Sequence, residues 1–113
     1  MYSAELVGLA AKRCTASFAD AGRTVSATVR ESDNVIDLAL IEPKSKTAIV
    51  RCVERCTEED VHALRLMLAQ GDFTRAAIVY TAEDQPELSG EIETYPLSRI
   101  DELAASLAKE RLP

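Results

Sequence analysis

The chain has 113 residues, of which 47% are hydrophobic and 28% are charged, with 13 Lys and Arg against 19 Asp and Glu. This length and composition favour one domain over residues 1–113, and they exclude a disordered chain, a collagen-like repeat and a membrane span of about 20 apolar residues. The net charge of −6 gives no general attraction to nucleic acid, because such binding depends largely on Lys and Arg that displace counterions from phosphates.

The first predicted elements are a helix over residues 3–19 and a strand over residues 23–30. Ser3 can cap the helix and Gly22 can end it, since both residue types are common at those positions. The apolar side chains that recur at helical spacing are Leu6, Ala10, Cys14 and Phe18. In the strand the pattern changes to period two, which predicts a half-buried strand. Its inward face would consist of Val25, Ala27 and Val29.

Two further strands are predicted over residues 35–41 and 47–53, with turns at 31–34 and 42–46. The first of them is a nearly continuous apolar run that only Asp37 interrupts, which is typical of a central strand covered on both faces. Because the connections are short, the three strands are expected to form an antiparallel meander.

A second helix is predicted to follow, capped by Thr57 with Asp60 in the capping-box position, and to end at Gly71. Its buried stripe would consist of Val61, Leu64, Met67 and Leu68. Residues 76–81 (AAIVYT) read as a fourth, buried strand, whereas the polar residues 82–90 read as a loop.

Residues 92–97 predict a short fifth strand, which Pro96 confines to an edge or an end of the sheet. Ser98 is expected to cap a last helix, which turns Ile100, Leu103 and Leu107 inward. The predicted order is therefore α-β-β-β-α-β-β-α. We expect an α/β (α+β) fold with a single-layer mixed five-stranded sheet flanked by helices.

Residues 35–55, VIDLALIEPKSKTAIVRCVER, resemble the core of the restriction endonuclease-like superfamily, whose motif is written PD-(D/E)xK. In that core a strand bearing one Asp is followed by a tight hairpin and by a strand that ends in a polar-x-Lys motif. The Mrr-type branch is the most similar, with its Asp in a V-D-L segment and its next strand ending V-Q-C-K. Residues 35–38 (VIDL) match the first part and residues 50–53 (VRCV) occupy the second. The remaining elements fall in the family order, so the resemblance covers about residues 3–110 and implies a restriction endonuclease-like core.

The resemblance also implies a degenerate active site. Active members hold one or two divalent cations between carboxylates, and the strand lysine orients or activates the attacking water. In this chain Asp37 keeps the carboxylate position, but Arg51 stands at the metal-binding Gln/Glu position and Val53 at the lysine position. Glu5 stands on the first helix, where some relatives place an acid. We therefore expect no cofactor and no catalysis, with Mg²⁺ bound at Asp37 and Glu5 only if the nuclease site is functional.

Strand alternation places Arg51 on the face that looks toward Asp37, and this leaves two interpretations of each charged group. Asp37 is either a relic metal ligand or a buried carboxylate paired with Arg51, and we favour the pair because it satisfies both groups. The basic side chains near the relic site form either a small phosphate-contacting patch or an ordinary solvated hairpin. These candidate nucleic-acid-binding residues are Lys44, Lys46, Arg51 and Arg55.

The histidine and the cysteines offer little further chemistry. His62 is the only histidine and lies near a helix start, where an exposed histidine is commonplace. The three cysteines are too few for a disulfide framework, which favours a reducing cytoplasm, and no second pair completes a zinc site with Cys52 and Cys56. We expect Cys52 to be a small core residue and Cys56 to carry a thiol somewhat activated by the helix start. The acids at residues 58–60 read as favourable charge at that helix start.

These observations lead to one favoured function and two alternatives. We expect a catalytically inactive nuclease-fold domain in the cytoplasm, a homodimer with no membrane contact, which binds nucleic acid weakly or supports a partner in DNA transactions. One alternative is a protein-interaction or secretion-chaperone-like dimeric module, and the other is an active metal-dependent nuclease with a relocated catalytic residue. The fourth strand discriminates between the first two, since it runs parallel to the third in the nuclease fold and antiparallel in the chaperone fold.

Overall fold

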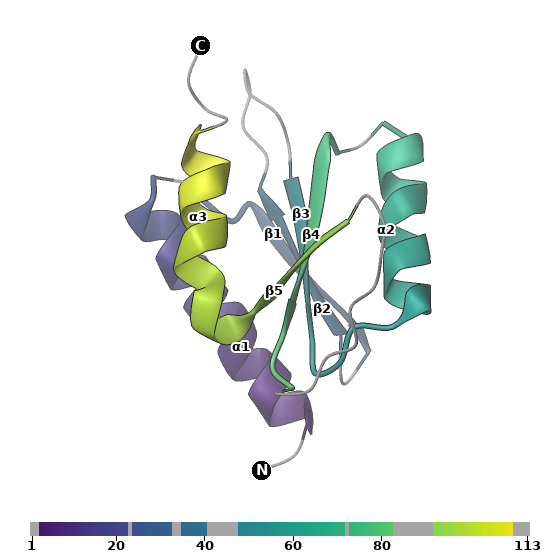
Figure 1. Ribbon diagram of the computed structural model, residues 1–113, viewed down its shortest axis with the longest axis horizontal. Coiled ribbons are helices and arrows are strands. Elements are labelled where there is room, and N and C mark those ends of the chain that lie inside the picture. Colours follow the sequence, from purple (N-terminus) through teal and green to yellow (C-terminus); the bar gives the residue numbers. More distant parts are fainter. Residues whose placement is uncertain are drawn as a thin grey trace.

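The computed structural model describes residues 3–22, 24–32, 35–40, 48–71, 73–82 and 92–109. These residues form three α-helices, a five-stranded sheet and one 3-10 turn, in the expected element order (Figure 1). No helix in the described part of the chain has the length and apolar character needed to cross a membrane. The elements are α1 (Ser3–Asp20), β1 (Ala27–Ser32), β2 (Val35–Leu40), β3 (Ala48–Val53), α2 (Glu58–Ala69), β4 (Arg75–Tyr80), β5 (Glu93–Pro96), η1 (Leu97–Arg99) and α3 (Ile100–Lys109).

The strands lie in the sheet in their sequence order, β1-β2-β3-β4-β5, and the sheet is mixed. The expected meander is confirmed, because β1 pairs antiparallel with β2 and β2 antiparallel with β3. β4 then pairs parallel with β3, and β5 parallel with β4. A parallel pair needs a crossover connection, and α2 provides it between β3 and β4. β5 lies at an edge of the sheet, as Pro96 predicted.

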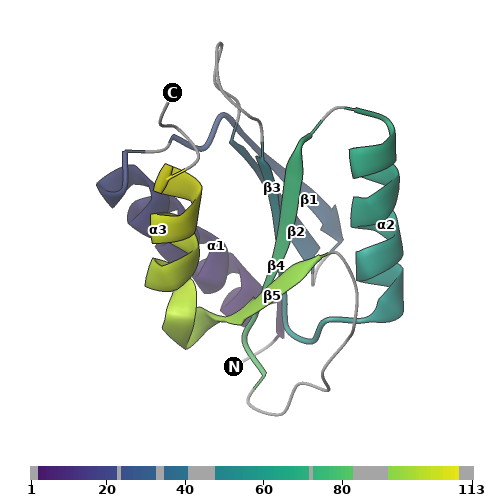
Figure 2. The same cartoon turned by 45° about the horizontal axis from the view of Figure 1, so that its top comes forward.

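Helices cover both faces of the sheet, two on one side and one on the other (Figures 1 and 2). α1 and α3 lie on the first face, where their apolar side chains join the strand residues of that face in one core. α2 covers the second face with a smaller core that includes Val61, Leu64 and Ile78. β2 and β3 are buried along nearly their whole length because both of their faces are covered, as the apolar run at residues 35–41 predicted.

The first strand differs from expectation in its position and in its burial. The predicted strand began at residue 23 with an inward face of three residues, but β1 begins at Ala27, and Val25 precedes it. Ala27 is exposed and half of Val29 is exposed. Val29 lies opposite Asp37 on the face that α2 covers, and α2 packs against β4 rather than against β1 at the edge. In the described part of the chain, no helix covers the β1 edge of the face on which Val29 lies. The apolar alternation of the sequence therefore does not produce a buried strand face there.

Both ends of α2 follow the sequence signals. The Thr57 hydroxyl accepts a hydrogen bond from the Asp60 backbone N–H, while the Asp60 carboxylate accepts one from the Thr57 backbone N–H, which completes the expected capping box. Gly71 follows the helix with a φ of 83°, a left-handed conformation that glycine adopts without strain. The expected cap of the last helix at Ser98 is wrong, because Ser98 lies inside the 3-10 turn η1 and α3 begins at Ile100.

Candidate functional site

The central feature of the candidate site is a buried ion pair between β2 and β3. Asp37 and Arg51 lie directly opposite each other in the antiparallel register, so both side chains leave the sheet on the face that α2 covers. Arg51 Nε lies 2.8 Å from Asp37 Oδ1 and Arg51 Nη2 lies 3.1 Å from Asp37 Oδ2. Asp37 is 3% exposed and Arg51 is 8% exposed. The favoured interpretation, a buried bidentate pair, is confirmed.

A second carboxylate completes the site from the start of α2. Arg51 Nη1 lies 3.2 Å from Asp60 Oδ1, so the guanidinium bridges two acids from different elements. The other carboxylate oxygen of Asp60 accepts hydrogen bonds from the Thr57 backbone N–H and from the Thr57 hydroxyl, each over 3.0 Å. Asp60 is 7% exposed. Its carboxylate therefore caps the helix and also neutralises a buried cation.

The sequence interpretation missed this second role of Asp60. The acids at residues 58–60 are predicted only as favourable charge at a helix start, with Asp60 in the capping box, but Asp60 is also buried against Arg51, while Glu58 and Glu59 are exposed. The available signal was the short connection from β3 to the capping box, because it brings the first turn of α2 back close to the strand that carries Arg51.

The electrostatics of this cluster keep Arg51 charged. Burial alone would lower the pKa of the Arg51 guanidinium, but the hydrogen bonds and negative charges of Asp37, and then those of Asp60, outweigh burial and raise that pKa. The cluster thus holds one permanent cation between two buried carboxylates. Such a cation repels a divalent metal ion and already uses the oxygens that a metal ion would need.

The predicted second acid of a metal site lies elsewhere in the fold. Glu5 is an exposed residue of α1, and α1 covers the face of the sheet opposite to the one on which Asp37 lies. The structure therefore does not bring Glu5 and Asp37 together, and the sheet separates them. Within the described residues, no three His, Cys, Asp or Glu side chains gather where they could hold a metal ion.

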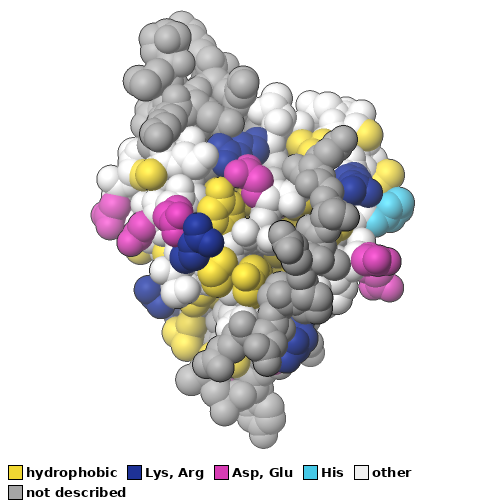
Figure 3. All heavy atoms as spheres, in the orientation of Figure 1, with side chains coloured by type: hydrophobic (Ala, Val, Ile, Leu, Met, Phe, Trp, Pro, Cys, Tyr) yellow, Lys and Arg dark blue, Asp and Glu magenta, His cyan; other side chains and the backbone are white. Residues whose placement is uncertain are grey.

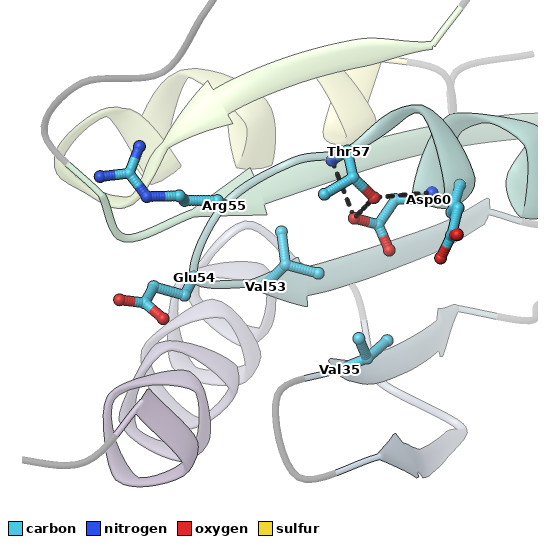
Figure 4. A pocket seen from close by; sticks show the side chains of 7 residues that line it. Val35, Val53, Glu54, Arg55, Thr57 and Asp60 are labelled. Carbon is cyan, nitrogen blue, oxygen red and sulfur yellow. Dashed lines mark hydrogen bonds between the residues drawn. The ribbon is translucent and has the colours of Figure 1, made fainter.

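A polar pocket opens beside this cluster, at the end of β3. Its volume is about 280 Å³, and Val53, which the motif resemblance aligns with a lysine, lies in its wall. Figure 4 shows Glu54 and Arg55 pointing together away from the capping pair Thr57 and Asp60. The pocket is lined by Val35, Val53, Glu54, Arg55, Thr57, Glu59 and Asp60. The lining contains three carboxylates and one guanidinium, so the wall is negative overall. A negative wall is unfavourable for binding a phosphate.

The basic residues expected to contact phosphates divide into three cases. Lys44 and Lys46 lie outside the described residues. Arg51 is buried, and its guanidinium is engaged with Asp37 and Asp60, which makes it unsuitable as a phosphate contact. Arg55 is exposed at the pocket. Among the described side chains on the molecular face in Figure 3, basic and acidic groups lie interspersed rather than in one basic patch.

The histidine and one of the cysteines have the expected environment. His62 is exposed on α2, and Cys52 is a fully buried core residue of β3. The expected activation of the Cys56 thiol is wrong. Cys56 is buried, and this burial, followed by the nearby charge of Asp60, raises the pKa of its thiol to about 11. The thiol is therefore protonated at neutral pH and is a poor nucleophile.

Comparison with known proteins finds no matching family model, no matching curated protein and no matching solved structure. What is established for this chain is its architecture: an α+β fold with three helices and a mixed five-stranded sheet, in which Asp37 and Arg51 pair at the centre.

Proposed function

We propose that the chain is a catalytically inactive domain with a restriction endonuclease-like core, which binds nucleic acid weakly or supports a partner in DNA transactions. The observation that carries this proposal is the buried cluster in which Arg51 bridges Asp37 and Asp60. The cluster lies where the motif resemblance expects a metal ion and its carboxylates, and it fills that place with a permanent cation.

The chemistry of phosphodiester cleavage supports the inactive assignment. Cleavage in this superfamily requires a cation that positions water and neutralises developing charge, and a lysine that assists the attack. Arg51 occupies both oxygens of Asp37, and Val53, at the lysine position, is 2% exposed and apolar. Neither Arg51, whose guanidinium is engaged, nor the apolar Val53 can orient a water molecule for attack. A nuclease with a relocated catalytic residue would need its acid and base elsewhere in the fold.

The strand arrangement favours the nuclease-like core over the secretion-chaperone-like alternative. β4 runs parallel to β3 and is reached through α2, which is the arrangement expected of the nuclease core. The chaperone alternative requires these two strands to be antiparallel. Strand direction bears on the fold class alone, so a protein-interaction role is the competing outcome of the binding experiment.

We expect the affinity of the chain for nucleic acid to be low. The net charge is −6, and the pocket beside the cluster carries more acids than bases. With Arg51 engaged inside the protein, the expected basic cluster retains Lys44, Lys46 and Arg55. Three phosphate contacts at most would give a slope of log K against log salt of about −2.7, from roughly −0.9 per contact on duplex DNA.

The test is a titration of the full chain with fluorescein-labelled duplex DNA, single-stranded DNA and RNA, from low salt to physiological salt. We expect weak binding at low salt, a slope no steeper than about −3 and loss of binding at physiological salt. The double reversal Lys44→Glu and Lys46→Glu should abolish this binding, whereas the matched reversal Lys109→Glu and Arg111→Glu should leave it intact. No binding at low salt, or equal loss in both variants, would favour the protein-interaction alternative.

A further inference from the structure

Two cysteines that are distant in the sequence meet inside the core between α1 and the sheet. Cys14 of α1 and Cys52 of β3 are 38 residues apart, and the Cys52 thiol donates a hydrogen bond to the Cys14 sulfur over 3.8 Å, Sγ to Sγ. Both side chains are fully buried. The two elements that carry them pack directly against each other. The fold thus presents a preassembled pair of thiols, on the face of the sheet away from the Asp37 cluster.

The two sulfurs are in contact and lie near bonding distance. A disulfide bond is about 2.05 Å long, so the two sulfurs must approach by somewhat less than about 2 Å. A movement of this size calls for rotation of each side chain about its Cα–Cβ bond and a small shift of α1, which already contacts β3. Cys56 belongs to the core on the other face of the sheet, so it does not compete for either partner.

We propose that Cys14 and Cys52 form an oxidisable dithiol whose disulfide fastens α1 to β3. The oxidant is a low-molecular-weight disulfide such as glutathione disulfide. One cysteine thiolate attacks a sulfur of the oxidant and releases one small thiol. The second thiolate then attacks the protein sulfur of this mixed disulfide and releases the other small thiol. The protein loses two protons and two electrons, and the oxidant is reduced to two thiols.

Burial sets the conditions under which the pair reacts. A thiolate is the attacking species, and the hydrogen bond to Cys14, burial and nearby negative charge raise the pKa of the Cys52 thiol well above its usual value. Because neither sulfur is exposed, the oxidant reaches the pair only when α1 lifts from the sheet. Oxidation is therefore slow in the native state and faster in mild denaturant, which increases the population of the opened state.

The disulfide would change the stability of the whole domain. It links residues 38 positions apart, so it removes conformational freedom from the unfolded chain, and it also prevents α1 from lifting. A loop of this length in a domain of this size is expected to raise the melting temperature by about 10 °C or more. In a reducing cytoplasm the thiols stay reduced, so this stabilisation would appear only under oxidising conditions.

The experiment treats the full chain and its Cys56→Ser variant with glutathione disulfide in mild denaturant. Non-reducing peptide mapping then identifies the linked cysteines, and melting is recorded before oxidation, after oxidation and after reduction. The matched control is Cys14→Ala in the same Cys56→Ser background. We expect a Cys14–Cys52 peptide in both proteins, a rise in melting temperature that reduction reverses, and no rise in the control.

Three results would overturn the proposal. The first is a stable glutathione adduct on one cysteine at equilibrium, and the second is a crosslink that involves Cys56. The third is a Cys14–Cys52 disulfide that leaves the melting temperature unchanged or lowers it. If Cys14→Ala fails to fold, the peptide map and the reversible melting shift of the Cys56→Ser protein still decide between these outcomes. None of these readouts depends on nucleic-acid binding.

Discussion

Removing the charges of the buried cluster should produce a strongly non-additive loss of stability. Arg51→Met leaves the carboxylates of Asp37 and Asp60 without their shared cation inside the protein. Loss of one partner of a buried ion pair typically costs about 3–5 kcal/mol of unfolding free energy, because an uncompensated charge stays behind. The loss of unfolding free energy for Arg51→Met should lie at the upper end of this range, at about 5 kcal/mol.

Asp37→Leu should cost less than Arg51→Met, because Arg51 keeps Asp60 as a partner. We expect a loss near the lower end of the same range, about 3 kcal/mol. If the effects were additive, the double variant would lose about 8 kcal/mol, which would unfold many small domains. Because Arg51→Met alone leaves two carboxylates without their cation and the double variant leaves only that of Asp60, the double variant should lose about 5 kcal/mol or less, a coupling of about 3 kcal/mol.

The assay is urea unfolding followed by circular dichroism, with the slope of unfolding free energy against urea checked for each protein. Arg99→Ala is the matched control, because Arg99 forms an exposed ion pair with Glu102 and its removal should leave the unfolding midpoint nearly unchanged. Additive losses at Asp37 and Arg51 would refute the reasoning, since they would mean that the two charges do not compensate each other. The reasoning would also be refuted if Arg51→Met lost no more unfolding free energy than Arg99→Ala.

Two further predictions follow from burial. The Cys56 thiol has its pKa raised to about 11 from the usual 9.0, so between these pH values the unfolded chain releases a proton that the folded protein keeps. Stability should therefore fall as pH rises from 9 to about 11, and Cys56→Ser should flatten this fall in pH-dependent urea titrations; a steeper fall would contradict the assignment. Val79 of β4 is fully buried while Val29 of β1 is half exposed. Val79→Ala should cost about 2 kcal/mol and Val29→Ala much less, and equal losses by thermal or urea unfolding would be inconsistent with an uncovered β1 edge.

Local signals in the sequence predicted most of the fold. The capping box of Thr57 and Asp60, the glycine after α2 and the apolar run of β2 each depend on neighbours within a few residues, and the structure confirms all three. The Asp37–Arg51 pair was predictable for a related reason. β2 and β3 are consecutive antiparallel strands in which Asp37 lies opposite Arg51, and strand alternation puts both side chains on one face.

What sequence reasoning missed depends on the placement of whole helices. Val29 alternates like a buried strand residue, yet half of it is exposed because α2 lies over β4 rather than over the β1 edge. Glu5 was assigned to the site of Asp37, but α1 covers the opposite face of the sheet. Asp60 became a partner of Arg51 because the first turn of α2 returns to β3. Neither periodicity nor capping chemistry reports where a helix docks.

The most direct test of the inactive nuclease-like assignment is a cleavage assay on the purified full chain. Supercoiled plasmid, single-stranded DNA and RNA are incubated with Mg²⁺ and separately with Mn²⁺, beside an Asp37→Asn variant whose folding is verified by circular dichroism. Because Arg51 occupies the Asp37 carboxylate and Val53 stands where the motif resemblance expects a lysine, we predict no cleavage by the natural chain beyond that of the variant. Cleavage that requires a divalent cation and disappears in Asp37→Asn would contradict the account.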